Sequence, residues 1–447
     1  MGVYELSAQS KQAIDAFFVQ YNSMGRPILD VLHNIFEGAF NILLAVAFAL
    51  SLIYIIMSIS VLLQKQMKRD GEKSWTPHVT VQIPTLNETV ALRCAERCLE
   101  FDYPKDKYEV IIGDDSSNAD VSMQIDEFAA QHPEIRVLRR GTNSGYKSGN
   151  LNNMLKHSKG EIIVLFDSDF LPSRDFLKRV VEPFAKDEKT AGVQARWKFV
   201  NAEQNLVAVL GSTIVEVFHR ITLPFVFKRR RISFLCGSAE AVRKDVLVKL
   251  GGWDHGNLTE DIEYSLRLMK NGYRIEYLED LECDSEVPYK PKDLYRQQMR
   301  WAYGVVSSYK KHAKDIYSSQ KIGIEDKAYI SLVCSGYLMT ILLAGLFITG
   351  ALSIVTHRPE PVDFGKFFFY TARNIAMTCG LMVASLIAVA KAKKARHIIK
   401  MLTASFSYGL IVAYHVNIGI YKAIFNRPMK WYMLSKGGSK TKTTIPN

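Results

Sequence analysis

Two aspartates, two residues apart, are the part of this sequence best suited to chemistry. Asp167 and Asp169 follow the apolar run 162–166, which is typical of a buried strand in a parallel sheet. Residues two apart on a strand face the same side, so both carboxylates can point out of its end, where open α/β sheets bind ligands. Paired oxygens suit Mg²⁺ or Mn²⁺, which in turn bind phosphates. A turn without a metal is the competing interpretation, because Asp and Ser favour turns.

Polar residues also follow the ends of two earlier predicted strands. They are Thr85, Glu88, Asp114 and Asp115. Such groups beyond adjacent parallel strands can bind a ribose and a base, although each alone is also typical of a turn or a helix cap. The glycine-rich stretch 141–152 then carries Lys147 into a helix, which suits a phosphate. Tyr146 separates Gly145 from Lys147 and the glycine spacing is not that of a dinucleotide fold, so the pattern does not favour an ATPase or a dehydrogenase.

Two later groups add an acid–base candidate and a binding candidate. Glu260 and Asp261 follow Thr259 at the start of a predicted helix, where a carboxylate can cap the helix or act as a general base. The second group, on a later helix, consists of Gln297, Arg300 and Trp301. Arginine can clamp a diphosphate and tryptophan can stack on a sugar ring. An amphipathic helix on a membrane surface explains this second group equally well.

The elements that must position these residues alternate along the middle of the chain. Apolar runs predict strands over residues 78–84, 108–113, 135–138, 161–166, 191–197, 232–236 and 273–278. Helical patterns fall between them, at 89–101, 120–132, 148–157, 173–186 and 259–271. This alternation predicts an α/β domain over residues 76–285, built on a mostly parallel, doubly wound sheet.

The composition points to a membrane. The chain has 447 residues, which is long for one domain, and its net charge is 57 − 45 = +12. A basic balance suits nucleic acid or an anionic membrane surface, and the long apolar segments favour the membrane, so no nucleic-acid partner is expected. The six cysteines lack the pairing of a zinc site. They are expected to be reduced packing residues.

Three apolar segments are long enough to cross a bilayer. They span residues 39–63, 328–355 and 367–390. Residues 1–38 form an amphipathic region that lacks the features of a cleavable signal peptide. Amphipathic helices at 203–227 and 291–313 are expected on the membrane surface, although both also fit ordinary domain helices. Residues 397–424 are expected to be interfacial, re-entrant or transmembrane, ahead of the basic tail 427–447.

Charges beside these segments predict their orientation. Basic residues follow the first segment at Lys65, Lys68, Arg69 and Lys73, and follow the third at Lys391, Lys393, Lys394 and Arg396. Because basic residues are enriched on the cytoplasmic side, residues 65–327 and 391 onward are expected in the cytoplasm. The sequence therefore predicts a multi-pass protein of the plasma (inner) membrane with a cytoplasmic α/β domain.

The order of the motifs resembles one family. Asp114-Asp115, Asp167-Ser-Asp169, Thr259-Glu-Asp261 and Gln297-x-x-Arg300-Trp301 are similar to the D, DxD, TED and QxxRW series of membrane-embedded family 2 glycosyltransferases, over residues 76–313. These include cellulose, hyaluronan, poly-N-acetylglucosamine and mannan synthases. The runs 193–197, 236–238 and 251–253 look closest to the cellulose-synthase-like branch, which makes glucan or mannan backbones. The resemblance implies a GT-A fold, an α-linked nucleotide sugar and Mg²⁺ or Mn²⁺.

The resemblance also implies a role for each matching residue. The nucleoside and phosphates would be held by Thr85, Glu88, Asp114, Asp115 and Lys147. Asp167 and Asp169 would hold the diphosphate and its metal ion, and Asp261, beside Glu260, would be the general base. The diphosphate and the acceptor sugar would contact Gln297, Arg300, Trp301, Cys236 and Gly237. A partial match to the gating loop of the family covers Trp431, Ser435 and Lys436, with Trp in place of Phe and the hydroxyl one place late.

The expected function is an inverting, processive β-glycan synthase that uses UDP-glucose and is coupled to secretion. One alternative is a β-mannan synthase using GDP-mannose. A second is a non-processive lipid glycosyltransferase of the ceramide glucosyltransferase type, and a third, from another class, is an inactive membrane scaffold. The partners implied are the nucleotide sugar, the growing glycan and the lipid bilayer. Three crossings are few for a polymer channel, so a homo-oligomer or an accessory subunit is also expected.

Overall fold

The computed structural model describes residues 8–20, 23, 25–64, 75–358, 361 and 363–436. The basic residues Lys65, Lys68, Arg69 and Lys73, and the tail after Lys436, lie outside these described residues. The chain divides into two compact units. Unit 1 comprises Met1–Ile55 and Met339–Met382, and unit 2 comprises Ile56–Leu338 and Val383–Asn447.

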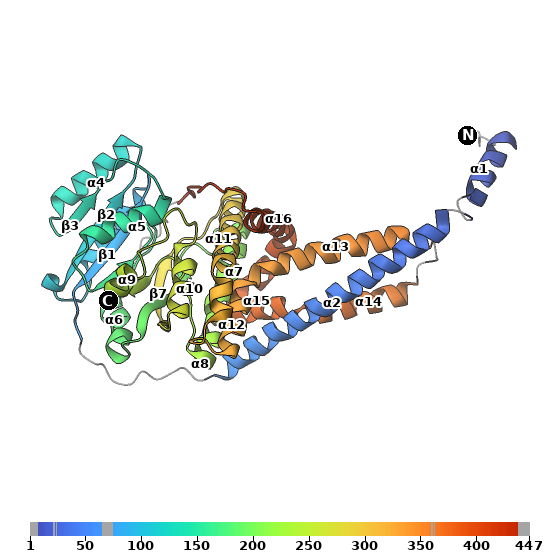
Figure 1. The fold of residues 1–447 in the computed structure, drawn as a ribbon. Helices are drawn as coiled ribbons and strands as arrows, with labels where there is room; N and C mark the ends of the chain where they lie inside the picture. The colour runs from blue at the N-terminus through green and yellow to red at the C-terminus, as the bar shows by residue number, and fades with distance from the viewer. Residues whose placement is uncertain are drawn as a thin grey trace. The chain divides into compact units, whose positions relative to one another are not determined.

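Unit 2 contains a seven-stranded sheet in the order β3-β2-β1-β4-β6-β5-β7 (Figure 1). The strands are β1 (Val79–Thr85), β2 (Tyr108–Asp114), β3 (Ile135–Leu138), β4 (Ile162–Leu165), β5 (Thr190–Phe199), β6 (Glu240–Arg243) and β7 (Arg274–Ser285). The first four pair in parallel, as do β5 and β7, whereas β6 is antiparallel to both of its neighbours. The mostly parallel α/β fold predicted from the sequence is therefore confirmed.

One predicted strand is wrong. Residues 232–236 are not a strand, and the strand in this region is β6, which begins at Glu240. The segment is apolar enough to look like a strand, but its backbone bonds to side chains. The Leu235 amide donates to Ser265 Oγ over 2.9 Å, and the Cys236 amide donates to Gln194 Oε1 over 2.7 Å. Gly237 then has φ +85°, a left-handed conformation that ends the extended run.

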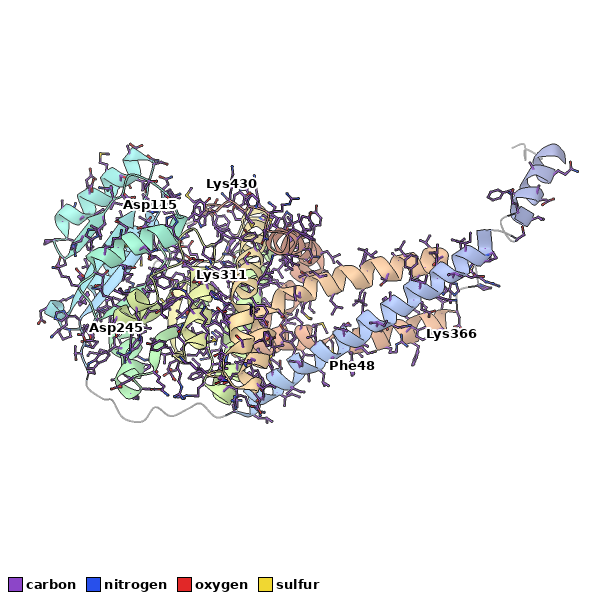
Figure 2. All side chains as sticks on the ribbon, viewed as in Figure 1. Phe48, Asp115, Asp245, Lys311, Lys366 and Lys430 are labelled. Carbon is purple, nitrogen blue, oxygen red and sulfur yellow. The ribbon has the colours of Figure 1, made fainter. Side chains whose placement is uncertain are left out.

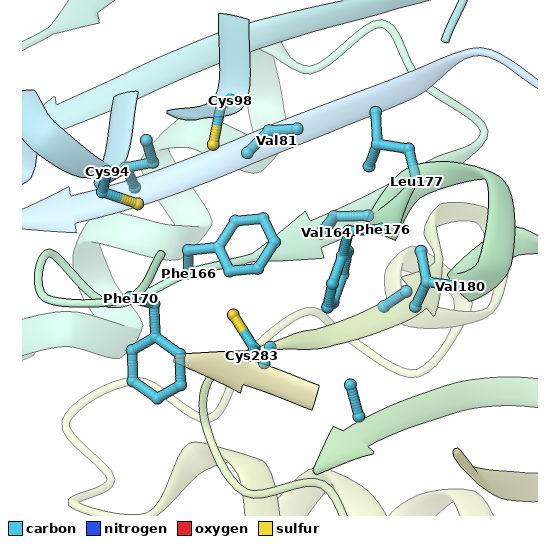
Figure 3. Close-up of a cluster of buried hydrophobic side chains, with 14 of the residues drawn as sticks. Val81, Cys94, Cys98, Val164, Phe166, Phe170, Phe176, Leu177, Val180 and Cys283 are labelled. Atoms are coloured by element: carbon cyan, nitrogen blue, oxygen red, sulfur yellow. The ribbon is translucent and has the colours of Figure 1, made fainter. Parts of the chain in front are cut away.

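Both faces of the sheet are buried, which explains the unbroken apolar run of β4. Val164 and Phe166 face a cluster that also contains Val81, Phe176 and Cys283 (Figure 3). Ile163 and Leu165 face the second cluster. The first face is covered by α3 (Val90–Leu99), α4 (Ala119–Gln131) and α6 (Phe176–Lys186), and the second by α5 (Tyr146–His157), α9 (Lys244–Lys249) and α10 (Glu260–Lys270).

Of the two predicted surface helices, the first is largely buried in the protein interior and the second is buried along one face. Residues 206–230 form α7 (Leu206–Val217), a π-helical turn η3 (Phe218–Thr222) and α8 (Leu223–Arg230), and most of their side chains are buried. Helix α11 (Pro291–Ser318) packs against α7 and against α16 (Ile398–Ile424). Because α16 is one continuous helix, it does not have the break expected of a re-entrant loop. Whether these helices touch a membrane stays a prediction.

Unit 1 consists mainly of apolar helices. Its elements are α1 (Ala8–Gln20), most of α2 (Arg26–Leu63), α13 (Met339–Thr356), α14 (Phe364–Thr378) and the start of α15 (Gly380–Lys391). Phe48 and many other large apolar side chains here are exposed (Figure 2). Within the unit, the Arg26 guanidinium donates to the Thr356 carbonyl, and the Gly380 amide donates to Ser51 Oγ.

Among the described residues, three helices are long and apolar enough to cross a membrane: Arg26–Leu63, Leu206–Arg230 and Gly336–Thr356. The second of these is mostly buried in unit 2. The segment predicted at 367–390 is broken into α14 and α15, which are bent by 57°. The segment predicted at 328–355 begins in α12 (Ile324–Cys334) and continues through η4 (Gly336–Leu338) into α13. All six cysteines are free, as predicted.

Candidate active site

A cavity of about 160 Å³ lies in unit 2, where β1, β2 and β4 end. It brings together nearly all of the residues selected from the sequence. Those that line it are Thr85, Glu88, Asp115, Lys147, Asp167, Asp169, Cys236, Gly237, Glu260, Asp261, Gln297, Arg300, Trp301, Trp431, Ser435 and Lys436. Asp114 is not among the lining residues. Parallel strands end at one edge of a sheet, which is why residues so far apart in sequence meet here.

The two aspartates that follow β4 are held by lysines. Asp167 Oδ1 lies 2.7 Å from Lys147 Nζ, and Asp169 Oδ1 lies 2.8 Å from Lys436 Nζ. Burial would raise the pKa of Asp167, but Lys147 and Lys436 outweigh burial and hold that pKa below its usual value. Each of the two carboxylates is therefore matched to a lysine ammonium group.

These aspartates fit a divalent metal ion that shares its coordination with a ligand. Among the described residues, no three His, Cys, Asp or Glu side chains are arranged to hold a metal on their own. Mg²⁺ is commonly bound through one or two carboxylates together with substrate phosphates. Asp167 and Asp169 supply such a pair, and each already binds a cationic ammonium group. The donor set therefore suits Mg²⁺ or Mn²⁺ in the presence of a diphosphate.

Lys147 is the centre of the charged network. It lies in the first turn of α5, after Gly145, whose φ of +69° gives the left-handed conformation that turns the chain into the helix. Its ammonium contacts Asp167, lies 3.1 Å from Glu260 Oε1 and donates to the Gly237 carbonyl over 2.5 Å. Burial would lower the pKa of Lys147, but Asp167 and Glu260 outweigh burial and raise it. Lys147 thus stays charged and joins β4 to α10.

Asp261 has the electrostatic properties of a base. It lies in the first turn of α10, and a Cβ added to Gly237 would lie 3.2 Å from Asp261 Oδ2, so only glycine leaves this space open. Burial and the nearby charge of Glu260 raise the pKa of Asp261 to about 7. A carboxyl with that pKa can take up and release a proton near neutral pH.

Glu240 was not selected from the sequence. It is fully buried at the start of β6 and accepts hydrogen bonds from the Cys236 amide over 3.1 Å and the Gly237 amide over 2.8 Å. Burial and the charge of Asp261 raise the pKa of Glu240 to about 8. Glu240 therefore fixes the turn at Cys236 and Gly237, which lies between the side chains of Lys147 and Asp261. An acidic residue beside the apolar Ala241 and Val242 was the signal that could have found it.

Asp114, the last residue of β2, and its neighbour Asp115 have different surroundings. Thr85 and Asp114 are register partners on β1 and β2. Asp114 accepts hydrogen bonds from the Ser116 amide, Ser122 Oγ and Arg139 Nε, over 2.9, 2.8 and 2.7 Å. Asp115 faces the cavity, and its Oδ1 accepts a hydrogen bond from Arg140 Nε over 2.9 Å. Its Oδ2 accepts a second hydrogen bond, from Arg140 Nη2 over 2.5 Å. Both aspartates are therefore held by an arginine, and of the two only Asp115 lines the cavity. That either of them binds a nucleoside stays a prediction.

Helix α11 carries the residues that were predicted to bind the acceptor. Arg300 Nη1 donates to the Leu258 carbonyl over 3.0 Å, and Trp301 lies 6.4 Å from Trp197, measured between ring centroids. Gly304 permits α11 to approach α10, because a Cβ there would lie 2.3 Å from Thr259 Cγ2. The helix with Arg300 and Trp301 is thereby placed against the turn that carries Asp261.

Residues 429–436, here called the strap, follow α16 and reach into the cavity. Lys436 Nζ lies 3.1 Å from Glu88 Oε2 and donates to Ser168 Oγ over 2.7 Å, besides its contact with Asp169. The Ser435 amide donates to Asp293 Oδ2 over 3.1 Å, and Ser435 Oγ accepts from Lys290 Nζ over 3.0 Å. The strap therefore closes one side of the cavity and supplies the cation beside Asp169.

Comparisons with known proteins agree with this geometry. Residues 77–304 match the family model described as glycosyltransferase like family 2. The chain is 29% identical to glucomannan 4-beta-mannosyltransferase 7 of Arabidopsis thaliana, over 65% of this chain and 56% of that protein. It is 31% identical to a probable glucomannan 4-beta-mannosyltransferase 11 of Oryza sativa subsp. japonica, over 57% of this chain and 46% of that protein. The chain thus spans about half the length of the curated relatives it matches.

A solved structure confirms the fold. It is the mannosyltransferase PcManGT from Pyrobaculum calidifontis in complex with GDP-Man and Mn²⁺, with a TM-score of 0.61 and 22% identity. The match covers 80% of this chain and 99% of that chain. The GT-A type of α/β fold, expected from the order of motifs, is therefore confirmed.

Proposed function

The chain belongs to glycosyltransferase family 2, and we propose that it is an inverting mannosyltransferase that moves mannose from GDP-mannose to the end of a β-mannan chain. The curated relatives named above carry the name glucomannan 4-beta-mannosyltransferase, and the solved neighbour is a complex with GDP-Man and Mn²⁺. These relatives favour GDP-mannose, which was the alternative, over UDP-glucose, which was the donor expected first. Extension of a β-linked chain rather than a single transfer is part of the proposal.

One observation carries the proposal of transfer chemistry. A carboxyl whose pKa is raised to about 7, Asp261, lines the same cavity as the aspartates that would bind a diphosphate, Asp167 and Asp169. A base near neutrality and a site for the leaving group are the two requirements of a single displacement at a sugar carbon.

Each of these residues would have its own role in the displacement. Asp261 takes the proton from the acceptor hydroxyl, whose oxygen forms the bond to the anomeric carbon of the donor. The bond from that carbon to the diphosphate oxygen breaks, and GDP leaves with the electron pair. Arg300 and Lys147 offset the charge that grows on the diphosphate. A single displacement turns an α-linked donor into a β-linkage.

Several residues would hold the donor and acceptor during this step. Asp167 and Asp169 would bind Mg²⁺ or Mn²⁺, which when bound supplies positive charge to the diphosphate. Thr85 and Asp115 would contact the nucleoside, and Trp301 offers a flat face to the acceptor sugar. The strap would act as the gating loop, with Lys436 exchanging Asp169 for a phosphate when donor binds. This role rests on the contacts of Lys436.

The location of the protein is also a proposal. The helices of unit 1 are long and apolar, and the flanking basic residues favour a cytoplasmic catalytic domain. We place the protein in the plasma (inner) membrane as a multi-pass protein, with a homo-oligomer or accessory subunit completing any path for the product.

The test is a product analysis with the full chain in detergent. GDP-mannose and UDP-glucose are compared, each with Mn²⁺, with Mg²⁺ and with EDTA, and nucleotide release and product length are measured. GDP release with formation of an EDTA-sensitive β-mannan supports the proposal. A glucan made from UDP-glucose would overturn the donor assignment, a singly mannosylated lipid would overturn chain extension, and no transfer from either donor would support an inactive scaffold.

A further inference from the structure

A second cavity in unit 2 has a volume of about 480 Å³ and lies apart from the catalytic residues. Its inner wall carries Arg196 of β5, Arg220 of η3 and Lys228 of α8, whose side chains are 7–12% exposed. Four lysines complete its lining: Lys198, Lys391, Lys393 and Lys394. A volume of this size is within the usual range of ligand pockets, roughly 300–1,000 Å³.

The positive charges of this basic cavity exceed the negative ones. Glu279 and Glu282 are the carboxylates that line it, and Glu279 pairs with Lys228 over 2.8 Å while Glu282 pairs with Arg220 over 3.0 Å. Glu216 and Asp284 pair with Lys394 and Lys198. Counting all four carboxylates against the seven cations leaves 7 − 4 = 3 positive charges without a matching negative one.

The surplus is concentrated at one side of the cavity. Among the described residues, Lys391 and Lys393 have no carboxylate within ion-pair distance, and both side chains are exposed. Cations that converge on a concave surface repel one another, and a bound anion relieves that repulsion. The two arginines add planar guanidinium groups, which match the geometry of phosphate oxygens.

The position of the basic cavity indicates the source of the anion. Val61 and Gln64 line it from the end of α2, and residues 391–394 line it directly after α15. Both helices belong to the segments that are long and apolar enough to cross a membrane. If they span a bilayer, their basic ends lie at the depth of the lipid headgroups.

We propose that this basic cavity binds the phosphate-bearing headgroup of an anionic membrane lipid. The inference rests on the proposed membrane insertion, not on the identity of the donor sugar. The site is separate from the catalytic cavity, because Arg196 and Lys198 face the basic cavity whereas Trp197, between them on β5, lines the catalytic one. Phosphate chemistry is shared by lipid headgroups and soluble phosphates, so the experiment must separate these two sources.

The experiment measures ligand-dependent thermal stability of the full chain in neutral detergent. The probes are short-chain phosphatidylglycerol, short-chain phosphatidylcholine, glycerol 3-phosphate and inorganic phosphate. The test variant is Lys391→Gln with Lys393→Gln, which removes two unpaired, exposed charges. The control is Lys156→Gln with Lys249→Gln, two exposed lysines elsewhere in unit 2 that change the net charge equally.

We expect phosphatidylglycerol alone to raise Tm in a saturable way. The apparent affinity should fall roughly 25-fold in the test variant, since each of the two lysines near an anionic lipid contributes about fivefold, and it should stay unchanged in the control. Equal shifts with glycerol 3-phosphate or inorganic phosphate would overturn the lipid assignment. An absent shift, or an equal loss in the control, would overturn the site. GDP and Mn²⁺ binding, measured on the same samples, tests the catalytic proposal separately.

Discussion

Lys147 and Lys436 lie against the aspartates that follow β4, and Asp261 is a cavity-lining acid whose pKa, about 7, is near neutrality. Glu260, next to Asp261, is already paired with Lys147. The two neighbouring acids of α10 therefore differ in function: one anchors a lysine and the other is available to a proton. This difference arises from the residues that each side chain contacts and not from position along the chain, because both side chains lie in the same helix turn.

Replacing Asp261 by asparagine should remove the base and retain the shape of the site. We expect Asp261→Asn to lower the rate of mannosyl transfer by about 10²–10⁴-fold, the usual contribution of a general base. GDP binding, measured by calorimetry, should change little, because the contacts predicted for the nucleotide lie on other residues.

The matched control for this substitution is Asp245→Asn, the same change at an exposed position on α9 (Figure 2). It should leave both the rate and GDP binding unchanged. Full transfer activity in Asp261→Asn would show that another group accepts the proton.

The raised pKa of Asp261 also predicts the pH dependence of the reaction. A pKa of about 7, compared with the ordinary 3.8, means that the carboxylate form, which is the base, predominates only above about pH 7. The value of kcat/KM should therefore fall about tenfold per pH unit below 7 and be constant above it.

Steady-state rates between pH 5 and 8.5 measure this profile, with Tm recorded at each pH to exclude unfolding. A constant kcat/KM down to pH 5 would mean that the base has an ordinary pKa, and Asp261 would then lose its assigned role.

At the scale of elements, the catalytic cavity has two kinds of wall. The ends of the strands form one side of it, and α11 and the strap, supported by α16, form the other. Helix α16 packs on α11, which carries Arg300 and Trp301, and the strap continues from α16 to Asp169. One end of the cavity therefore depends on strand ends and the other on helices that come late in the chain.

The ion pair of the strap predicts competition between Lys436 and a divalent cation. Lys436→Ala should strengthen Mn²⁺ binding in the absence of donor by at least about tenfold, because Asp169 and Glu88 lose a positive charge at close range. Manganese titration followed by electron paramagnetic resonance measures the change.

Lys430→Ala, an exposed lysine of the same strap, is the control and should leave Mn²⁺ affinity unchanged (Figure 2). Weaker Mn²⁺ binding in Lys436→Ala would indicate that the lysine organises the aspartates rather than competing for them.

The local sequence pattern was sufficient to predict elements whose apolar residues are the ones that the fold buries, such as β1 and β4. It failed at 232–236, because the partners of that backbone, Ser265 and Gln194, lie far away in sequence. Glu240 and Arg140 were missed for the same reason: their importance comes from tertiary neighbours. The separate surroundings of Asp114 and Asp115 follow from two adjacent arginines, which no spacing rule connects to them.

At the scale of the whole molecule, apolar helices and a catalytic unit are joined in one chain. The sequence located the apolar segments, but it did not reveal the break between α14 and α15, because the uncharged stretch 374–390 runs through Cys379 without interruption. It also assigned 203–227 to a membrane surface. Unit 2 buries most side chains of 206–230, and contact of this stretch with a membrane stays a prediction. Apolar composition alone does not distinguish a lipid partner from a protein partner.

The charge pattern predicts opposite sides of the membrane for Lys366 and Asp245 (Figure 2). A membrane-impermeant maleimide should label Lys366→Cys in intact cells, and should label Asp245→Cys only after the membrane is permeabilised. The unsubstituted chain, with its six free cysteines, gives the background. The reverse pattern would invert the proposed orientation.

The contact between Glu88 and Lys436 has a consequence for the synthesis of the protein. The two residues are 348 positions apart, so at about 5–20 residues per second a ribosome needs roughly 17–70 s to make the second after the first. Throughout that time, the nascent chain contains the strands whose ends line the cavity, but it lacks Lys436, the cation beside Asp169. Because Lys436 is translated long after the sheet, a fragment that is released before Lys436 lacks the finished pocket, and synthesis itself delays the first turnover until the strap has been made.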